Sequence, residues 1–272
     1  MKELELIHPD HLPQGRVRAA IFDFDGTFST LRCGWEQVMA PMMLEMISGG
    51  KAEDASDELR QEVNTYIDTS TGIQTVYQMR WLQERVEAEG RAVAGRDQWW
   101  YKDEYNRRLM EQVQVRMDRL NQGLDQPGQY LIAGAVEFLH KLRDLGIDVY
   151  LASGTDHSDV LREAAALGVA DCFTAIKGAP ERQVACSKEA VLRMILEEKK
   201  LPGEALLLVG DGKVEIALGA KCGAYCLGAA TDETARHGVN PVKRDRLIRA
   251  GADAIVGDFS DLDGLLHWMG IC

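Results

Sequence analysis

The sequence predicts an α/β protein in which helices cover both faces of a parallel sheet, with an all-helical block inserted after the first strand. Three observations lead to this class. The apolar run "RAAIFDF" is followed by Asp-Gly, which indicates a buried strand and a turn. Helical periodicity then continues for about a hundred residues, and from about residue 132 strand-like and helix-like segments alternate. We therefore expect a core of residues 1–30 and 131–272 and a helical domain of residues 31–130.

The inserted block is predicted to contain long amphipathic helices. One helix face carries apolar side chains at regular spacing, namely Trp35, Val38, Met39, Met42, Met43 and Met46. A second helix is expected in "STGIQTVYQMRWLQERVEAEG", with Ile73, Val76, Tyr77 and Trp81 on one side. The third, "DQWWYKDEYNRRLMEQVQVRMDRL", is long and charged on its outside. The methionines are expected to fill the core of this block, because thioether side chains adapt to irregular gaps.

The alternating part of the chain predicts the rest of the sheet. Short apolar runs indicate strands within residues 147–154, 172–178, 204–212, 224–230 and 252–259. Amphipathic segments indicate helices within residues 134–146, 157–169, 187–201, 214–223, 242–251 and 260–269. In a parallel sheet of this kind, ligands bind beyond the carboxyl ends of the strands. The candidate site is therefore sought at those ends.

Charge and apolar patterning exclude several classes of partner. The chain has 43 acidic and 31 basic residues and a net charge of −12, without the basic stripe of a nucleic-acid-binding protein. No apolar run approaches the roughly 18 residues of a membrane span, and the N-terminus lacks the features of a signal peptide. The six cysteines and six histidines form no zinc-ligand spacing. We expect a cytoplasmic protein with no membrane or nucleic-acid partner, either a monomer or a homodimer.

Carboxylates gather where two of the predicted strands end. Asp23 and Asp25 follow the first strand and, because side chains alternate along a strand, point to the same side. Two carboxylates held close repel each other unless a cation lies between them or one is protonated. The strand within residues 204–212 delivers Asp211, and Glu215 follows four residues later. Acids from two strand ends suit a hard cation with oxygen ligands, and Mg²⁺ is the ion we expect.

A hydroxyl and a lysine complete the predicted crevice. A strand ends at Ser153, and Gly154 and Thr155 follow it with backbone N–H groups at an expected helix start, which suits an anion. A lysine beside the crevice would supply a fixed positive charge. Lys177 and Lys188 are the two candidates, and Lys188 is preferred because it starts a helix 23 residues before Asp211.

Taken together, these residues resemble the haloacid dehalogenase superfamily, most of whose members are phosphatases. The resemblance rests on DFDGT at Asp23–Thr27, on Ser153, on Lys188 and on GDGKVE with Asp211 and Glu215. It implies a Rossmann-like core. The long helical block directly after the first motif is similar to the cap domain of that superfamily's phosphoglycolate-phosphatase and β-phosphoglucomutase branch.

The resemblance also implies a role for each of these residues. Asp23 would attack phosphorus and form an aspartyl-phosphate, and Asp25 would protonate the leaving oxygen and then activate water. Mg²⁺ would be held by Asp23, by the backbone carbonyl of Asp25 and by Asp211, with Glu215 in contact through water. Ser153 and Lys188 would bind the phosphoryl oxygens, assisted by Gly154 and Thr155. Thr27 would position Asp25 or the phosphate.

A Mg²⁺-dependent phosphatase acting on a small phosphorylated metabolite, such as a sugar phosphate, is therefore the leading hypothesis. A dehalogenase is disfavoured, because halide leaves without a proton and those relatives lack an acid at the Asp25 position. A phosphomutase with the same nucleophile and a similar cap is the alternative, and it predicts transfer within one sugar with little phosphate release. A regulatory pseudo-enzyme has no physical reason to retain the whole set of residues.

Substrate specificity is expected in the segment after Thr27 and in the loops of the helical cap. A cap over the crevice would exclude water and contact the leaving group. The segment "DTSTGIQT" combines small residues and amides, which suit hydroxyl groups or a carboxylate. The candidates for substrate binding are Arg32, Trp35, Glu36, Thr71, Gly72, Gln74, Gln78 and Arg80.

Overall fold

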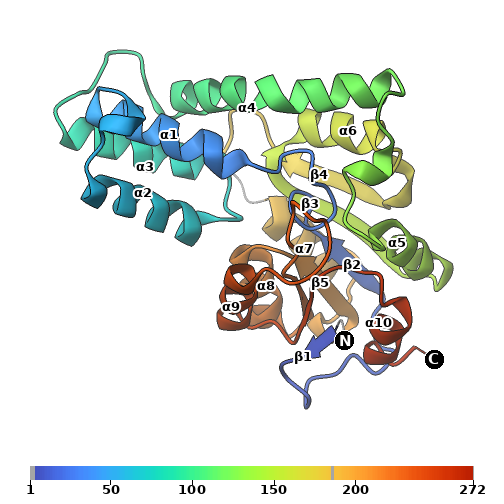
Figure 1. The fold of residues 1–272 in the computed structure, drawn as a ribbon. Helices are drawn as coiled ribbons and strands as arrows, with labels where there is room; N and C mark the ends of the chain where they lie inside the picture. Colours follow the sequence, from blue (N-terminus) through green and yellow to red (C-terminus); the bar gives the residue numbers. More distant parts are fainter. Residues whose placement is uncertain (1–3, 185–186, 272) are drawn as a thin grey trace.

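The computed structural model describes residues 4–184 and 187–271, which are built around a seven-stranded sheet (Figure 1). The strands are β1 (Leu4–Leu6), β2 (Ala19–Phe22), β3 (Asp148–Asp156), β4 (Ala175–Ala179), β5 (Leu206–Gly210), β6 (Tyr225–Ala229) and β7 (Ala254–Val256). Their order across the sheet is β1-β7-β6-β5-β2-β3-β4. Neighbouring strands are parallel except β1, which lies antiparallel to β7. β1 has no counterpart among the predicted strands, because three residues are too few to show a periodicity.

Helices cover both faces of this sheet, as predicted for the α/β class. One face is covered by α5 (Ala135–Asp144), α6 (His157–Ala166) and α10 (Leu262–Trp268). The other face is covered by α7 (Ser187–Glu197), α8 (Lys213–Cys222) and α9 (Pro241–Ala250). Short 3₁₀ helices occupy Ala52–Asp54, Pro127–Gln129, Ala170–Cys172 and Gly203–Ala205. The helices at 134–146, 157–169, 187–201, 214–223, 242–251 and 260–269 are therefore confirmed.

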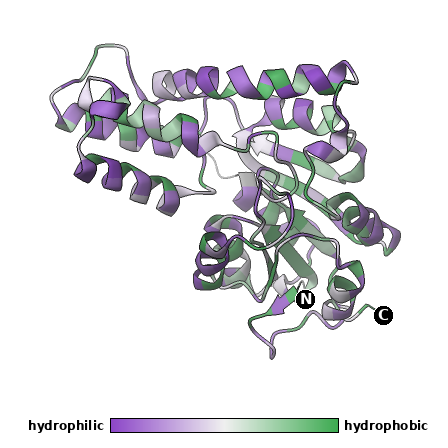
Figure 2. Ribbon diagram, viewed as in Figure 1, coloured by the Kyte–Doolittle hydropathy of each residue, from purple (hydrophilic) through white to green (hydrophobic). Residues whose placement is uncertain are grey.

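The central strand β2 packs apolar side chains into both layers. Its residues alternate, so that Ala20 and Phe22 belong to one apolar cluster and Ala19 and Ile21 to the other. All four are buried, which explains why the strand reads as a continuous apolar run. Figure 2 shows this apolar character concentrated in the strands, while the helices carry hydrophilic residues on their outer sides.

The block after the first strand forms α1 (Trp35–Ser48), α2 (Asp57–Ser70), α3 (Thr75–Ala88) and α4 (Gln98–Asn121), which lie outside the sheet layers (Figure 1). On α1 the methionine-rich face is buried as expected, including Met39, Met42 and Met43. The expected face of α3 was partly wrong, because Tyr77 is exposed and the buried apolar positions are Val76, Met79, Leu82 and Val86. These positions follow a spacing of three and four residues, which places them on one side of the helix.

Two contacts bring the helical block onto the carboxyl ends of the strands. The α2–α3 loop lies directly over the end of β3 and the loop after β5. A Cβ added at Gly154 would lie 3.2 Å from the carbonyl oxygen of Ile73, and one added at Gly72 would lie 3.3 Å from Gly212 Cα. The long helix α4 packs against α6 of the core. The apolar interior of the block is continuous with that of the sheet. The helical block therefore closes over the end of the sheet at which ligands are expected.

None of the described helices combines the length and the apolarity that are needed to cross a membrane. Four of the cysteines are free thiols, of which Cys172 and Cys226 are buried and Cys33 and Cys222 are half-buried. Cys186 and Cys272 lie outside the described residues.

Candidate active site

Three adjacent strands in the order β5, β2 and β3 end at the candidate site. The turn after β2 reverses sharply at Gly26, whose φ of 76° lies in the left-handed region that favours glycine. A Cβ at this position would also lie 2.4 Å from Asp211 Oδ2. Glycine in "DFDGT" is therefore required both for the turn and for the close approach of the Asp211 carboxylate.

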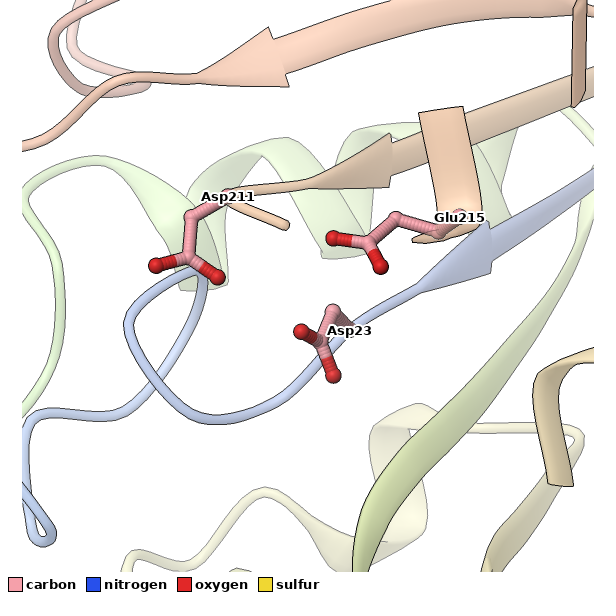
Figure 3. Close-up of side chains that lie close together, drawn as sticks. All are labelled: Asp23, Asp211 and Glu215. Atoms are coloured by element: carbon pink, nitrogen blue, oxygen red, sulfur yellow. The ribbon is translucent and has the colours of Figure 1, made fainter. Parts of the chain in front are cut away.

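Asp23, Asp211 and Glu215 form a buried cluster of carboxylates (Figure 3). One oxygen of each lies within 4.8 Å of the others, and all three side chains are buried. Burial raises the pKa of Asp23 well above its ordinary value; the charge of Lys188 opposes this shift, and the neighbouring carboxylates increase it. Such a cluster of buried oxygen ligands suits a hard divalent cation, so the residues present fit the expected Mg²⁺.

Lys188 lies within this cluster and is buried. Its Nζ atom lies 2.7 Å from Glu215 Oε2 and 3.0 Å from Asp23 Oδ2. Burial alone would lower the pKa of Lys188, but the two carboxylates outweigh it and raise the pKa above its ordinary value. Lys177, the competing candidate, is exposed on the edge strand β4. The geometry therefore places Lys188, and not Lys177, next to Asp23.

Glu215 is held at both carboxylate oxygens. Oε2 accepts a hydrogen bond from Lys188, and Oε1 accepts one of 2.6 Å from the backbone N–H of Gly212. A Cβ at Gly210 would lie 2.2 Å from Glu215 Oε1, so the strand can end beside this side chain only with glycine. The longer reach of glutamate at this position is thus used to bridge Lys188 and the Gly212 backbone.

The second aspartate, Asp25, has different surroundings from Asp23. Its Oδ2 atom accepts hydrogen bonds from the Thr155 hydroxyl at 2.8 Å and the Ser153 hydroxyl at 3.3 Å. Its Oδ1 atom accepts no hydrogen bond from the described residues, and the Nε atom of Arg32 lies 3.9 Å from it. Two carboxylates that are close in sequence are therefore held in two environments, one among charges and one among hydroxyls.

The position of Ser153 and Thr155 corrects one expectation. The strand was predicted to end at Gly154, but β3 continues to Asp156, and α6 begins at His157, where the helix was predicted to start. Because alternate residues of a strand face the same side, the two hydroxyls both reach Asp25. The backbone N–H of Thr155 is used locally, since it donates to the Ser153 hydroxyl at 3.1 Å.

These side chains line a cavity of about 100 Å³ between the strand ends and the helical block. The predicted site residues that line it are Asp23, Asp25, Arg32, Trp35, Ser153, Gly154, Thr155, Lys188 and Asp211. The predicted loop residues Thr71, Gly72 and Gln78 line it as well. A cavity of this size is far below the roughly 300 Å³ at which drug-sized ligand pockets begin.

Five predicted residues do not line the cavity. Glu215 lies behind Lys188, as described above, and Glu36 on α1 is also outside the lining. Thr27 is fully buried, and its hydroxyl has no hydrogen-bond partner among the described residues. Gln74 is buried at the start of α3. Arg80 does not line the cavity either, and its Nε atom donates to Gln98 Oε1 at 2.7 Å within the helical block.

Several residues at the site had no signal in the sequence. Tyr105 and Leu109 of α4 line the cavity, although their spacing of four residues reads only as a helix face. Lys243 of α9 is buried, and its Nζ atom lies 2.6 Å from both Asp211 Oδ2 and Glu233 Oε1. The N-cap Asn240 and Pro241 could have located the start of α9, but nothing local to the sequence relates this helix to Asp211.

The fold and the site define a class: a doubly wound α/β protein whose strand ends carry acids and a lysine beneath a helical block. A family model described as haloacid dehalogenase-like hydrolase matches residues 17–223, and the chain belongs to this family.

Individual relatives share only low sequence identity with this chain. A protein named phosphoglycolate phosphatase from Yersinia pseudotuberculosis is 22% identical over 210 residues, covering 73% of this chain and 87% of the relative. The crystal structure of a predicted phosphoglycolate phosphatase from Haemophilus somnus aligns with a TM-score of 0.61 and 15% identity, covering 92% of this chain and 98% of the other. A β-phosphoglucomutase from Clostridium difficile aligns with a TM-score of 0.63 and 12% identity, covering 93% and 97%. At this identity the solved structures establish the shared fold.

Proposed function

We propose that the chain is a Mg²⁺-dependent phosphatase that hydrolyses a small phosphorylated metabolite through an aspartyl-phosphate on Asp23. The observation that carries the proposal is the contrast between the two aspartates after β2. Asp23 lies 3.0 Å from the Lys188 ammonium within a cluster of carboxylates, whereas Asp25 accepts hydrogen bonds from two hydroxyls. Paired carboxylates in different environments are suited to two different chemical roles.

In the first step, an oxygen of Asp23 attacks phosphorus, and the bond from phosphorus to the leaving oxygen breaks. Asp25 gives a proton to that oxygen, so that a neutral alcohol departs. In the second step, water attacks phosphorus and transfers its proton to Asp25, while the Asp23 carboxylate is released together with inorganic phosphate. The contact of Asp25 with Ser153 and Thr155 is suited to hold its carboxyl group beside the cavity in both steps.

Charge neutralisation is assigned to Lys188 and to the metal site. The Lys188 ammonium opposes the rise in the pKa of the buried Asp23 carboxyl and would bind the phosphoryl oxygens. Asp23 and Asp211, together with the backbone carbonyl of Asp25, would hold Mg²⁺, and Glu215 would contact the ion through water. The bound cation would offset the negative charge of the phosphoryl group as it approaches a carboxylate.

Residues 31–130 are proposed to act as the cap of this site, and residues 1–30 and 131–272 as the catalytic core. The loop of Thr71, Gly72 and Ile73 supports this division, because it lines the cavity and touches the backbone of Gly154 and Gly212. A closed cap would exclude bulk water and strengthen the electrostatic contacts inside. Opening of the cap would then be needed for substrate entry.

Phosphate release is the measurement that tests this function. The purified protein is incubated with a panel of small phosphate esters, with Mg²⁺ or with EDTA, beside the variant Asp23→Asn. We expect inorganic phosphate only from the wild-type protein with Mg²⁺. Release that persists in EDTA or in Asp23→Asn would contradict the proposal. Conversion of one sugar phosphate into an isomer, with little free phosphate, would identify the alternative phosphomutase instead.

A further inference from the structure

One guanidinium group dominates the part of the cavity that is left for the leaving group. Apart from the reacting acids and Lys188, the polar lining consists of Arg32 and of neutral side chains such as Thr71, Gln78 and Tyr105. Among the described residues that line the cavity, Arg32 and Lys188 are the cationic side chains. Lys188 is already engaged by Asp23 and Glu215. The chemistry of Arg32 therefore decides which leaving group the cavity accepts.

Arg32 is locked in place from the side of α6. Its Nε atom donates to both carboxylate oxygens of Glu163, at 3.0 and 3.2 Å. Its Nη2 atom donates to Glu163 at 2.6 Å and to Asp159 at 3.1 Å. Its Nη1 atom has no hydrogen-bond partner among the described residues, so two N–H donors remain for a ligand in the cavity that Arg32 lines. Because one edge of the planar guanidinium is held by these carboxylates, its other edge can bind a ligand with little further loss of side-chain entropy.

The charge around this guanidinium is negative. Arg32 supplies one positive charge, and the carboxyl groups of Asp25, Asp159 and Glu163 lie within 3.9 Å of it. When Asp25 holds the proton that it gives to the leaving oxygen, Asp159 and Glu163 leave a net charge of −1 if both are ionised. Burial raises the pKa of Glu163 to about 7, against the opposing charge of Arg32, so this net negative charge is partial at neutral pH and complete above it. A carboxylate in the leaving group would meet this negative charge without an unpaired cation to offset it.

Apart from Lys188, no further cationic side chain among the described residues lines the cavity beside this group. Lys102 of α4 is paired with Asp156, and neither residue lines the cavity. The two undescribed residues before α7 are Ala185 and Cys186, whose side chains carry no positive charge. The available ligands for the leaving group are thus the Arg32 Nη1 donors and neutral groups that both donate and accept hydrogen bonds.

We propose that Arg32, held by Glu163 and Asp159, is a specificity-determining residue that selects phosphate esters of uncharged, hydroxyl-bearing leaving groups and rejects esters that carry a carboxylate. The inference rests on the proposed phosphatase function and deepens it. Arg32 Nη1 donates to a hydroxyl oxygen of the leaving group, and the neutral lining completes the hydrogen bonds. Phosphoglycolate, the substrate in the name of the Yersinia relative, carries a carboxylate and is therefore rejected by this chain.

A matched pair of substrates tests the selection. Phosphoglycolate and 2-hydroxyethyl phosphate differ only in a carboxylate that replaces a CH₂OH group, and p-nitrophenyl phosphate serves as a general ester. We expect kcat/KM for 2-hydroxyethyl phosphate to exceed that for phosphoglycolate by about 100-fold, as follows for like charges ~6 Å apart at an effective dielectric constant of ~20. A preference for phosphoglycolate, with Asp23-dependent hydrolysis of the general ester, overturns the inference and leaves the phosphatase function intact. No hydrolysis of any ester overturns both.

Variants that remove the negative charge of the carboxylates beside Arg32 test the role of this residue in selecting the substrate. Glu163→Gln keeps an acceptor for Arg32 and removes one negative charge, and Asp159→Asn does the same at a less buried position. Each variant should lower the ratio of kcat/KM for 2-hydroxyethyl phosphate to kcat/KM for phosphoglycolate by about tenfold. The change should come mainly from a lower KM for phosphoglycolate, as expected when one negative charge is removed. The control Glu111→Gln removes a charge from an exposed pair with Arg107 and should leave the ratio unchanged. If both test variants keep the wild-type ratio while remaining folded, the assignment to Arg32 is overturned.

Discussion

The Nζ atom of Lys243 lies 2.6 Å from Oδ2 of Asp211, one of the three carboxylates of the proposed metal site. The same ammonium lies 2.6 Å from Glu233 Oε1. Burial would lower the pKa of Lys243, but the two carboxylates outweigh it and raise the pKa. Lys243 therefore holds Asp211 through one oxygen and leaves the other available to a cation.

Removing this ammonium should destabilise the metal-free protein. Lys243→Met leaves the buried Asp211 and Glu233 without their cation, and the expected loss is about 3–5 kcal/mol in the free energy of unfolding. Mg²⁺ should restore more stability in this variant than in the wild type, because the ion supplies the missing positive charge. Thermal unfolding with and without Mg²⁺ measures both effects. Lys199→Met, which breaks an exposed pair with Asp148, is the control and should cost about 0–1 kcal/mol. Equal losses in the two variants would contradict the prediction.

Asp25→Asn should affect alcohol and aryl esters differently. An alkoxide leaving group needs a proton in the first step, so kcat for an alkyl phosphate should fall by about 10²–10⁴. p-Nitrophenolate leaves without a proton, so the variant should still form the phosphorylated enzyme from p-nitrophenyl phosphate and then stall before hydrolysis. Rapid mixing should show a burst of nitrophenolate close to one equivalent of enzyme. Loss of the burst would argue against Asp25 as the acid and base.

Metal affinity should depend on pH through Asp23. Burial raises the pKa of the Asp23 carboxyl, so in the metal-free protein it becomes protonated at a higher pH than an ordinary aspartate. A protonated carboxyl is a poor ligand, and Mg²⁺ affinity should therefore fall as pH is lowered, by up to about tenfold per unit below that pKa. Calorimetric titration with Mg²⁺ at several pH values measures the slope. Asp23→Asn should bind Mg²⁺ more weakly, and its affinity should depend less on pH. An unchanged pH dependence in this variant would show that the proton is bound by another group.

Gly26→Ala should lose both stability and metal binding. The new Cβ would meet Asp211 Oδ2 at 2.4 Å in addition to adopting a positive φ. Gly90→Ala is a matched control, since Gly90 has a φ of 67° but no atom within 4 Å of the added Cβ. Both variants should lose about 1–2 kcal/mol through backbone strain, but only Gly26→Ala should bind Mg²⁺ more weakly. Equal Mg²⁺ affinities in the two variants would show that the close approach at Gly26 is unimportant.

The fold and the inner part of the site could be predicted because their signals are local. Asp23 and Asp25 directly follow an apolar run, and Asp211 follows another, so the rule for parallel strands brings them together without any knowledge of contacts. Lys188 was placed by its position at the start of the helix before β5. The end of β3 was misplaced, because Gly154 reads as a stop signal although the strand continues through it.

The outer part of the site depends on contacts between distant segments. Arg32 and Glu163 are 131 residues apart, and no pattern in the sequence relates them. Tyr105 lies on a helix whose periodicity shows that the residue is buried but not that a cavity adjoins it. Arg80 and Gln74 were chosen from the composition of one segment, and the direction of a side chain on a helix cannot be read from composition.

The most direct test of the account is to trap the phosphoryl group on the protein. Asp25→Asn is mixed with p-nitrophenyl phosphate and Mg²⁺, quenched with acid within one turnover, and examined by mass spectrometry of its peptides. We expect one phosphoryl group on the peptide that contains Asp23, and none in the double variant that also carries Asp23→Asn. Phosphate release by the wild-type protein without any label on Asp23, or with label on another side chain, would contradict the central claim.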